Sequence, residues 1–255
     1  MSTLAHGLSD STTMLKRTLR HTLRDPIWLG ASIATPTLFL LLFRYLFGNA
    51  IAAGSGESGA YVDYVMPGIL VLAIATSASA TAVSVSADGA KGIIGRFRTM
   101  AIARTSVLTG HAVANVIRTG VSVVLVLAIG LLIGFRPSAS VVEWLLTAGL
   151  LVLLSTAVSW LAITIGLAFS TPESANSMSL LIQFLPFLSS TFVPPESMSP
   201  GVRWFAEHQP YTPVIETVRG LLLGDTIGNQ AWWAVGWCVG LALVGYFGAR
   251  ARFAR

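Results

Sequence analysis

The sequence predicts an all-α integral membrane protein with six transmembrane helices. Of its 255 residues, 54% are hydrophobic and only 11% are charged, whereas a soluble domain carries about 25% charged residues. The mean hydropathy is +0.73. A chain this poor in charge cannot cover a surface that faces water, so much of its surface is expected to face lipid.

Six apolar stretches have, or nearly have, the length of about 20 residues that crosses a bilayer. The fifth stretch is short and is interrupted by Pro186. The chain is expected to form a single transmembrane domain over residues 1–255. Its predicted spans are 27–47, 64–86, 112–134, 143–169, 176–193 and 231–248.

The distribution of arginine and lysine predicts the orientation, because these residues accumulate on cytoplasmic segments. Cations cluster before span one, between spans two and three, and after span six, while most carboxylates lie in the other segments. Six spans place all three basic segments on one side. Both termini are therefore expected in the cytoplasm. The same rule accounts for the pI of about 9.9 without a nucleic-acid partner.

Two segments outside the spans have an amphipathic pattern. Residues 10–26 are expected to form an interfacial helix with cations facing the lipid headgroups; its cations are Lys16, Arg17, Arg20 and Arg24. The alternative is a plain basic flank. Between spans five and six, Val202–Phe205 and Val214–Leu223 are too short to span and are expected to form re-entrant helices. The alternative there is a surface loop.

The inner loop Ala87–His111 combines four cations with five apolar residues, Ile93, Ile94, Phe97, Met100 and Ile102. This spacing favours a short helix with one apolar and one basic face, suited to a groove on a partner protein. The alternative is a helix that packs against its own bundle.

Catalytic and energy-coupling motifs are missing from the sequence. A P-loop requires a lysine after a glycine, and neither Lys16 nor Lys91 follows one. No HExxH or GxSxG pattern occurs, and the 11 carboxylates lie in loops or at span ends, which disfavours proton coupling. The serines and threonines of span two suit close helix packing, with a role in lining a pathway as the alternative.

Two motifs resemble the permease subunits of type-2 ABC exporters of the daunorubicin/doxorubicin-resistance group. The first is GIIGRFRTMAIAR at Gly92–Arg104, which is similar to the family pattern GIxxRFRSLPIxR, with Ala101 in place of the usual proline. The second is PFLSSTFVP at Pro186–Pro194, followed by QPYTPVIE at Gln209–Glu216. The resemblance extends over nearly the whole chain.

The resemblance implies a division of labour. Two permease subunits, identical or paralogous, would form the pathway for an amphipathic substrate such as a drug, an antibiotic or a lipid. Two separate P-loop ATPase subunits would bind ATP and Mg, so no cofactor is expected in this chain. The location implied is a bacterial plasma membrane. An apolar cavity at the dimer interface, lined by spans one, two and five, is also expected.

The resemblance also assigns roles to residues. The interfacial helix would be a second contact with the ATPase. The residues implied in coupling to the ATPase are Gly92, Ile93, Ile94, Arg96, Phe97, Arg98, Met100 and Arg104. The residues implied in an outer gate are Phe192, Pro194, Gln209, Pro210, Thr212, Pro213 and Glu216. The alternatives are an ATP-independent carrier or channel, and a membrane-embedded enzyme or structural component.

Overall fold

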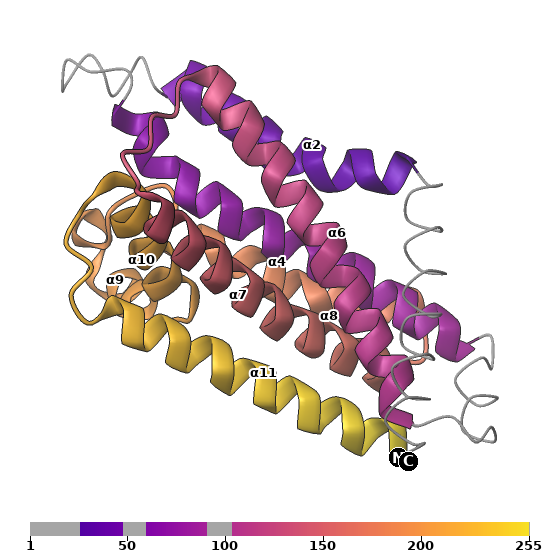
Figure 1. The fold of residues 1–255 in the computed structure, drawn as a ribbon. Helices are drawn as coiled ribbons and strands as arrows, with labels where there is room; N and C mark the ends of the chain where they lie inside the picture. Colours follow the sequence, from indigo (N-terminus) through magenta and orange to yellow (C-terminus); the bar gives the residue numbers. More distant parts are fainter. Residues whose placement is uncertain (1–25, 48–59, 91–103, 255) are drawn as a thin grey trace.

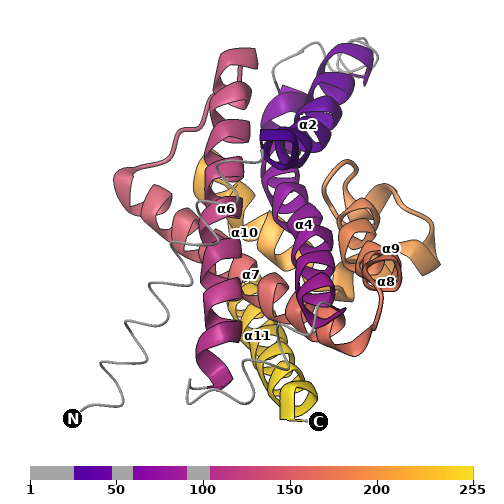
Figure 2. The same ribbon diagram turned by 90° about the vertical axis from the view of Figure 1, so that its right-hand side faces the viewer.

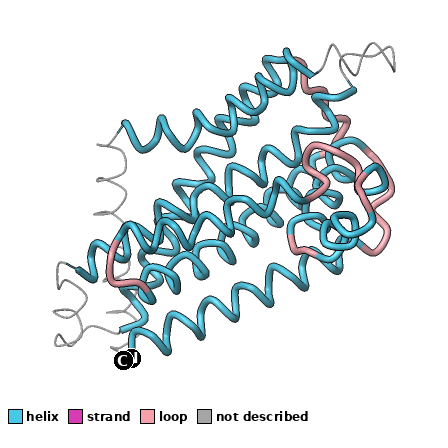
Figure 3. Tube along the Cα trace, turned by 180° about the vertical axis from the view of Figure 1, so that it is seen from behind, coloured by secondary structure: helices cyan, strands magenta, loops and turns pink. Residues whose placement is uncertain are grey.

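The protein is a bundle of long helices with a group of short helices at one end (Figure 1). The computed structural model describes residues 26–47, 60–90 and 104–254, and these residues form helices and connecting loops without a strand (Figure 3). The helices are α2 (Pro26–Leu42), η1 (Phe43–Phe47), α4 (Ala60–Ala90), α6 (Arg104–Ile133), α7 (Val141–Ala168), α8 (Pro172–Phe184), η2 (Leu185–Leu188), η3 (Pro195–Ser197), α9 (Pro200–His208), α10 (Tyr211–Leu223) and α11 (Gln230–Ala254).

Within this part of the chain, four helices are long and apolar enough to cross a membrane. They are Tyr61–Ala90, Leu108–Ile133, Val141–Ala168 and Gln230–Phe253, and they correspond to predicted spans two, three, four and six. The all-helical membrane fold is therefore confirmed. These helices extend beyond most of the predicted bounds, because backbone hydrogen bonding continues through polar residues at the ends of an apolar stretch.

The first and fifth predicted spans are not among these four helices. Predicted span one forms α2 and the π-helical η1, whose apolar part is the shorter Ile33–Leu46. Predicted span five is α-helical only as far as Phe184, where a 3₁₀ turn containing Pro186 begins. Proline lacks the N–H that would continue an α-helix. The count of six spans stays a prediction.

Local sequence explains where two helices begin. Ser140 caps α7: its hydroxyl accepts a hydrogen bond from the Glu143 N–H at 3.4 Å, and the Glu143 carboxylate accepts one from the Ser140 N–H at 2.6 Å. This reciprocal capping box satisfies two N–H groups that a helix start leaves unpaired. Thr171 caps α8 with its hydroxyl, which accepts a hydrogen bond from the Ser174 N–H at 3.3 Å, and Pro172 lies in the first turn.

Helix α4 is the centre of the bundle. In the turned view of Figure 2 it lies between α6 on one side and α8 with α9 on the other, and it contacts α2, α6, α7, α8 and α10. The apolar window of α4 is 72% buried, compared with 22% for α6 and 17% for α11. Helices α6 and α11 therefore present long apolar faces to the surroundings, as expected in lipid.

Helices α7 and α11 approach each other closely at Gly245. A Cβ atom at this position would lie 2.7 Å from backbone atoms of Trp160 and Leu161. The Thr164 hydroxyl donates a hydrogen bond of 2.7 Å to the Gly245 carbonyl. Small residues at helix crossings allow this kind of contact in membrane proteins, so Gly245 sets the distance between the two helices.

Candidate functional site

The short helices at one end of the bundle form a compact unit, which we call the cap and define as residues 185–223 (Figure 1). The two helical stretches expected between spans five and six are confirmed as helices α9 and α10. All seven predicted gate residues lie in the cap. Phe192, Gln209, Thr212 and Pro213 are buried, Pro210 and Glu216 are half-buried, and Pro194 is exposed.

A buried arginine of α10 joins the cap to α4. The guanidinium of Arg219 donates hydrogen bonds to the Tyr64 carbonyl at 3.2 and 3.0 Å and to the Ser190 carbonyl at 2.8 Å. It also lies 3.8 Å from the centre of the Tyr64 ring and pairs with Glu216 at 2.5 Å. Since a buried charge requires such partners, Arg219 holds three segments together.

Sequence reasoning named Glu216 but not Arg219 as a site residue. The available signal was their spacing, because residues i and i+3 of a helix share a face. A cation three residues after a carboxylate, within the apolar stretch Val214–Leu223, indicates a buried pair on α10.

The turn at Ser189–Thr191 lies directly against α4. The Ser189 hydroxyl donates to the Pro186 carbonyl at 2.5 Å and accepts from the Thr191 N–H at 3.2 Å, which fixes the turn internally. A Cβ at Gly68 would lie 2.5 Å from the Thr191 side chain and 2.7 Å from its Cα. Only glycine at position 68 permits this contact without displacement of the turn.

Aromatic rings connect the cap to the end of α2 and to η1. Phe192, a predicted gate residue, stacks on Phe43 with ring centres 4.3 Å apart, and Phe187 meets Phe39 edge-on at 5.1 Å. On α4, the Tyr61 hydroxyl donates to the Phe192 carbonyl at 3.2 Å. Aromatic pairs of this kind add stabilisation beyond the area they bury. The cap therefore contacts η1 and α4 through Phe192, and α2 through Phe187.

The cap also contains buried polar atoms without a hydrogen-bond partner. These are the Ser190 hydroxyl, the Gln209 side-chain oxygen and the Thr212 hydroxyl. A buried unpaired polar group costs about 1–3 kcal/mol. Any arrangement of the cap that exposes these atoms to water would remove that cost.

A second polar cluster lies among α4, α6 and α7. The Asn115 amide donates to the hydroxyls of Ser159 at 2.8 Å and Ser77 at 3.3 Å. The Arg118 guanidinium donates to the Asn115 side-chain oxygen at 2.6 Å and to the Thr81 hydroxyl at 3.3 Å. Ser77 and Thr81 therefore serve contacts between helices, which favours the packing interpretation of the hydroxyls in span two.

Arg118 lies near the middle of α6, which begins at Arg104. Its described hydrogen-bond acceptors, Thr81 and Asn115, are neutral. Its side chain points back toward the start of α6, as helical side chains do.

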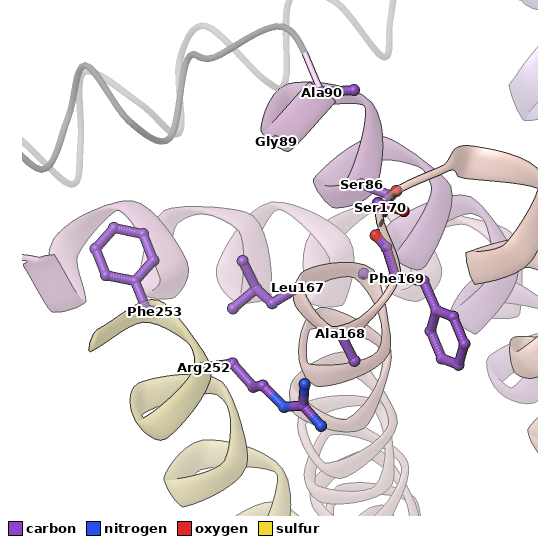
Figure 4. A pocket seen from close by; sticks show the side chains of 10 residues that line it. Ser86, Gly89, Ala90, Leu167, Ala168, Phe169, Ser170, Arg252 and Phe253 are labelled. Atoms are coloured by element: carbon purple, nitrogen blue, oxygen red, sulfur yellow. Dashed lines mark hydrogen bonds between the residues drawn. The ribbon is translucent and has the colours of Figure 1, made fainter. Parts of the chain in front are cut away.

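The opposite end of the bundle contains an open pocket of about 420 Å³ (Figure 4). It is formed by the final turns of α4, α7 and α11, with Arg252 among its lining residues. The Ser86 hydroxyl donates to the Phe169 carbonyl at 3.0 Å and links the ends of α4 and α7. A cation beside the carboxyl-terminal end of a helix is electrostatically favourable, because the last carbonyl groups carry partial negative charge.

Most residues predicted to couple to an ATPase lie outside the described part of the chain. They are Gly92, Ile93, Ile94, Arg96, Phe97, Arg98 and Met100, and the cations of the predicted interfacial helix, Lys16, Arg17, Arg20 and Arg24, lie outside it as well. Of the segment Ala87–His111 that was expected as an inner loop, residues 87–90 belong to α4 and residues 104–111 belong to α6. Arg104 is thus the first residue of α6.

The fold defines a multi-pass helical membrane protein. Within the described ranges, no group of three or more His, Cys, Asp or Glu residues could hold a metal ion. Residues 10–223 match the ABC-2 type transporter family, and the chain belongs to this family. The relatives in this family are permease subunits of ABC transporters, and the family generally works with ATPase partner subunits.

Three similar proteins cover most of the chain. A daunorubicin resistance ABC transporter permease of Streptomyces coeruleorubidus is 30% identical over 95% of this chain and 84% of its own length. A probable doxorubicin resistance permease of Mycobacterium tuberculosis is 25% identical over 89% and 82%. A putative transport permease of Porphyra purpurea is 29% identical over 81% and 71%. The resemblance inferred from the two motifs is therefore confirmed.

Proposed function

We propose that this chain is the membrane permease subunit of an ATP-driven exporter of amphipathic compounds such as drugs, antibiotics or lipids. The names of two relatives, which refer to daunorubicin and doxorubicin resistance, support this substrate class. ATP and Mg bind to two separate P-loop ATPase subunits. A second permease subunit, identical or paralogous, completes the pathway in a bacterial plasma membrane.

The proposed topology has six spans, with both termini in the cytoplasm. The four long helices supply four spans, α2 with η1 supplies the first, and α8 with the turn after it supplies the fifth. The cap is re-entrant and faces outward. This assignment is supported by the position of α9 and α10 at the end of the bundle opposite the last turns of α4 and α11 (Figure 1). Arg250 and Arg252 lie at the end of α11, as the bias of cations toward the cytoplasm requires.

The proposed coupling depends on helix α4. It runs without interruption from Ala60 to Ala90, a length of about 46 Å at 1.5 Å per residue. Near its start, Tyr61 and Tyr64 donate hydrogen bonds to the cap. Its last residue, Ala90, directly precedes the predicted coupling segment. One buried helix thus connects the proposed ATPase contact with the proposed gate.

In this mechanism, closure of the ATPase subunits moves the segment after Ala90 and tilts α4. The tilt displaces Tyr61 and Tyr64 relative to the cap, and the cap separates from the bundle near Phe192–Pro195 and Gln209–Pro213. The unpaired polar atoms of the cap then gain water as a partner.

The test is to co-express the chain with its ATPase and to measure complex assembly and ATP-dependent efflux in proteoliposomes. Phe97→Ala and Arg98→Ala are expected to weaken both. Arg203→Ala is the matched control, because Arg203 lies exposed on α9 at the other end of the bundle and pairs with Glu207 one helical turn further along. Normal assembly and efflux in both coupling variants would remove the proposed role of the segment.

The rival function is a carrier or channel that operates without ATP. It predicts transport by the purified chain in liposomes without nucleotide or ATPase, and a loss of transport when the proton gradient collapses. The proposed exporter predicts no transport under the first condition.

A further inference from the structure

A half-buried arginine of the bundle has no counter-ion among the described residues. The guanidinium of Arg118 on α6 makes two described hydrogen bonds, both from Nη2, to the Thr81 hydroxyl and to the Asn115 side-chain oxygen. A guanidinium has five N–H donors. The N–H groups of Nε and Nη1 therefore have no acceptor in the part of the chain that the structure describes, and they are available to a ligand.

The helices around α6 do not supply a carboxylate to Arg118. Helix α6 contacts α2, α4, α7 and α11, and neither α2 nor α11 contains an aspartate or a glutamate. Each carboxylate of α4 and α7 has another partner: the Arg136 N–H for Asp63, His111 for Asp88, and the Ser140 N–H for Glu143. A cation inside a membrane protein is costly unless an opposite charge accompanies it, so Arg118 calls for an anion from outside these helices.

The depth of Arg118 places its charge near one surface of the membrane. Arg118 lies six residues beyond the start of predicted span 112–134, about 9 Å at 1.5 Å per residue. Its side chain points back toward the start of α6, which is cytoplasmic in the proposed topology. Long arginine side chains near the end of a span reach the headgroup layer in this way. The anion within reach there is the phosphate of an inner-leaflet lipid.

An open apolar strip continues from Arg118 toward the middle of the membrane. Val121 and Leu125 follow Arg118 by three and seven residues, so they lie on the same side of the helix. They are 42% and 39% exposed. A phospholipid of the inner leaflet has its groups in the same order, with the phosphate at the surface and the acyl chains directed inward. The cation and the strip together therefore match one lipid in one orientation.

We propose that Arg118 binds the phosphate of an anionic phospholipid, with an acyl chain along Val121 and Leu125. Arginine suits phosphate, because its guanidinium is always charged and presents several donors in one plane. The bonds from Nη2 to Thr81 and Asn115 orient the guanidinium, and Nε and Nη1 face the ligand. The assignment to the inner leaflet rests on the proposed topology, whereas the contact between Arg118 and phosphate does not.

Native mass spectrometry of the full-length chain in detergent tests the binding. The probe is dioleoylphosphatidylglycerol. Dioleoylglycerol has the same chains without the phosphate, and glycerol phosphate has the phosphate without the chains. We expect saturable binding of the phospholipid and affinities at least about tenfold lower for both references, since a hydrogen bond to a charged group contributes about a factor of ten or more. Tight binding of glycerol phosphate would show an adventitious ion site only and would overturn the proposal.

Three variants identify the cation that is responsible. Arg118→Gln should weaken binding of the phospholipid at least about tenfold and leave dioleoylglycerol unchanged. Arg118→Lys keeps the charge, and a lysine also binds phosphate, so it should retain most of the affinity. Arg203→Gln is the control, because it changes the net charge equally but removes a cation that pairs with Glu207 on the cap. It should bind as the wild type does.

A second measurement uses the wild type alone and locates the lipid. Phosphatidylglycerol with a diazirine in its acyl chain is photolysed with the chain in nanodiscs, and mass spectrometry identifies the labelled residues. We expect label at Val121 and Leu125, reduced by an excess of unlabelled phosphatidylglycerol. Label spread over all lipid-facing helices, without competition, would overturn the proposal even if Arg118→Gln failed to fold.

Two further results would also overturn it. One is equal binding of phosphatidylglycerol and dioleoylglycerol. The other is an Arg118→Gln variant that loses self-association but keeps its lipid, which would assign the counter-ion to a second permease subunit. No ATPase is present in these experiments, and binding in detergent does not depend on leaflet. Failure of ATP-driven export or of the topology would therefore leave the lipid result unchanged.

Discussion

Replacement of Arg219 by methionine is expected to release the cap from α4. Methionine has a similar length but no donor, so the variant loses the bonds to the Tyr64 and Ser190 carbonyls and the pair with Glu216. A hydrogen bond to a charged group contributes about 1.5–3 kcal/mol. In the variant, the Ser190 carbonyl still accepts a hydrogen bond of 3.1 Å from the Tyr64 hydroxyl, and this lowers the free energy that the substitution costs. We expect about 3 kcal/mol, or about a hundredfold in the equilibrium between docked and released caps.

The assay uses a single reactive cysteine in the cap. Cys238 is the only cysteine of the chain, so Cys238→Ala gives a background without thiols. Ser190→Cys then places a thiol at a fully buried position whose hydroxyl has no partner to lose. Its rate of reaction with a maleimide in detergent reports the released population, and Arg219→Met should raise this rate about a hundredfold.

Two further variants test whether the effect on the reaction rate is specific to the bonds of Arg219. Tyr64→Phe removes only the hydrogen bond to the Ser190 carbonyl and should raise the rate about fivefold. Arg203→Met removes an arginine of the same cap whose pair with Glu207 is exposed, and exposed pairs contribute little, so the rate should not change. If the Ser190→Cys protein with Arg219→Met reacts no faster than the Ser190→Cys protein that keeps Arg219, then Arg219 does not anchor the cap.

Two other substitutions test packing within the bundle. Gly245→Ala should destabilise the protein by about 1–3 kcal/mol, because the new Cβ would lie 2.7 Å from a backbone atom of Trp160. Gly240→Ala is the control: its Cβ would meet nothing within 4 Å, so the melting temperature should not fall. Asn115→Leu should destabilise by about 2–4 kcal/mol, since the charge of Arg118 loses its 2.6 Å acceptor. A second substitution, Arg118→Leu, should recover part of that loss in thermal unfolding, and a purely additive double variant would contradict the coupling.

The long helices could be predicted from the sequence because hydropathy alone determines which stretches enter lipid. Spans two, three, four and six are strongly apolar over about 20 residues or more, and each appears as one helix. The cap helices were also predictable, because Val202–Phe205 and Val214–Leu223 are apolar stretches preceded by a proline; Pro200 is the first residue of α9 and Pro213 lies in the first turn of α10. The interruption of the fifth stretch was signalled by Pro186, and α8 ends at Phe184, two residues before it.

Contacts between distant segments could not be predicted. Arg219 reaches Tyr64 across 155 positions in the sequence, and neither residue carries a local signal for the other. The start of α6 could not be placed from hydropathy, because the helix continues from the apolar stretch through polar residues as far as Arg104. The polar cluster among α4, α6 and α7 depends on how three helices pack, and side-chain type alone gives no such geometry. The cavity expected at a dimer interface stays a prediction.

The energetics of the cap fit the proposed gate. The bonds of Arg219 favour docking by a few kcal/mol, and the three unpaired polar atoms of the cap oppose it by about 1–3 kcal/mol each. The unpaired atoms therefore offset part of the stabilisation of the docked cap. The smaller the free-energy difference between docked and released caps, the more easily a distant binding event can shift the equilibrium. An apolar residue at position 212, as in Thr212→Val, removes one unpaired hydroxyl and should therefore favour the docked cap. The Ser190→Cys reaction should become slower in that variant, and a faster reaction would show that the hydroxyl of Thr212 stabilises closure instead.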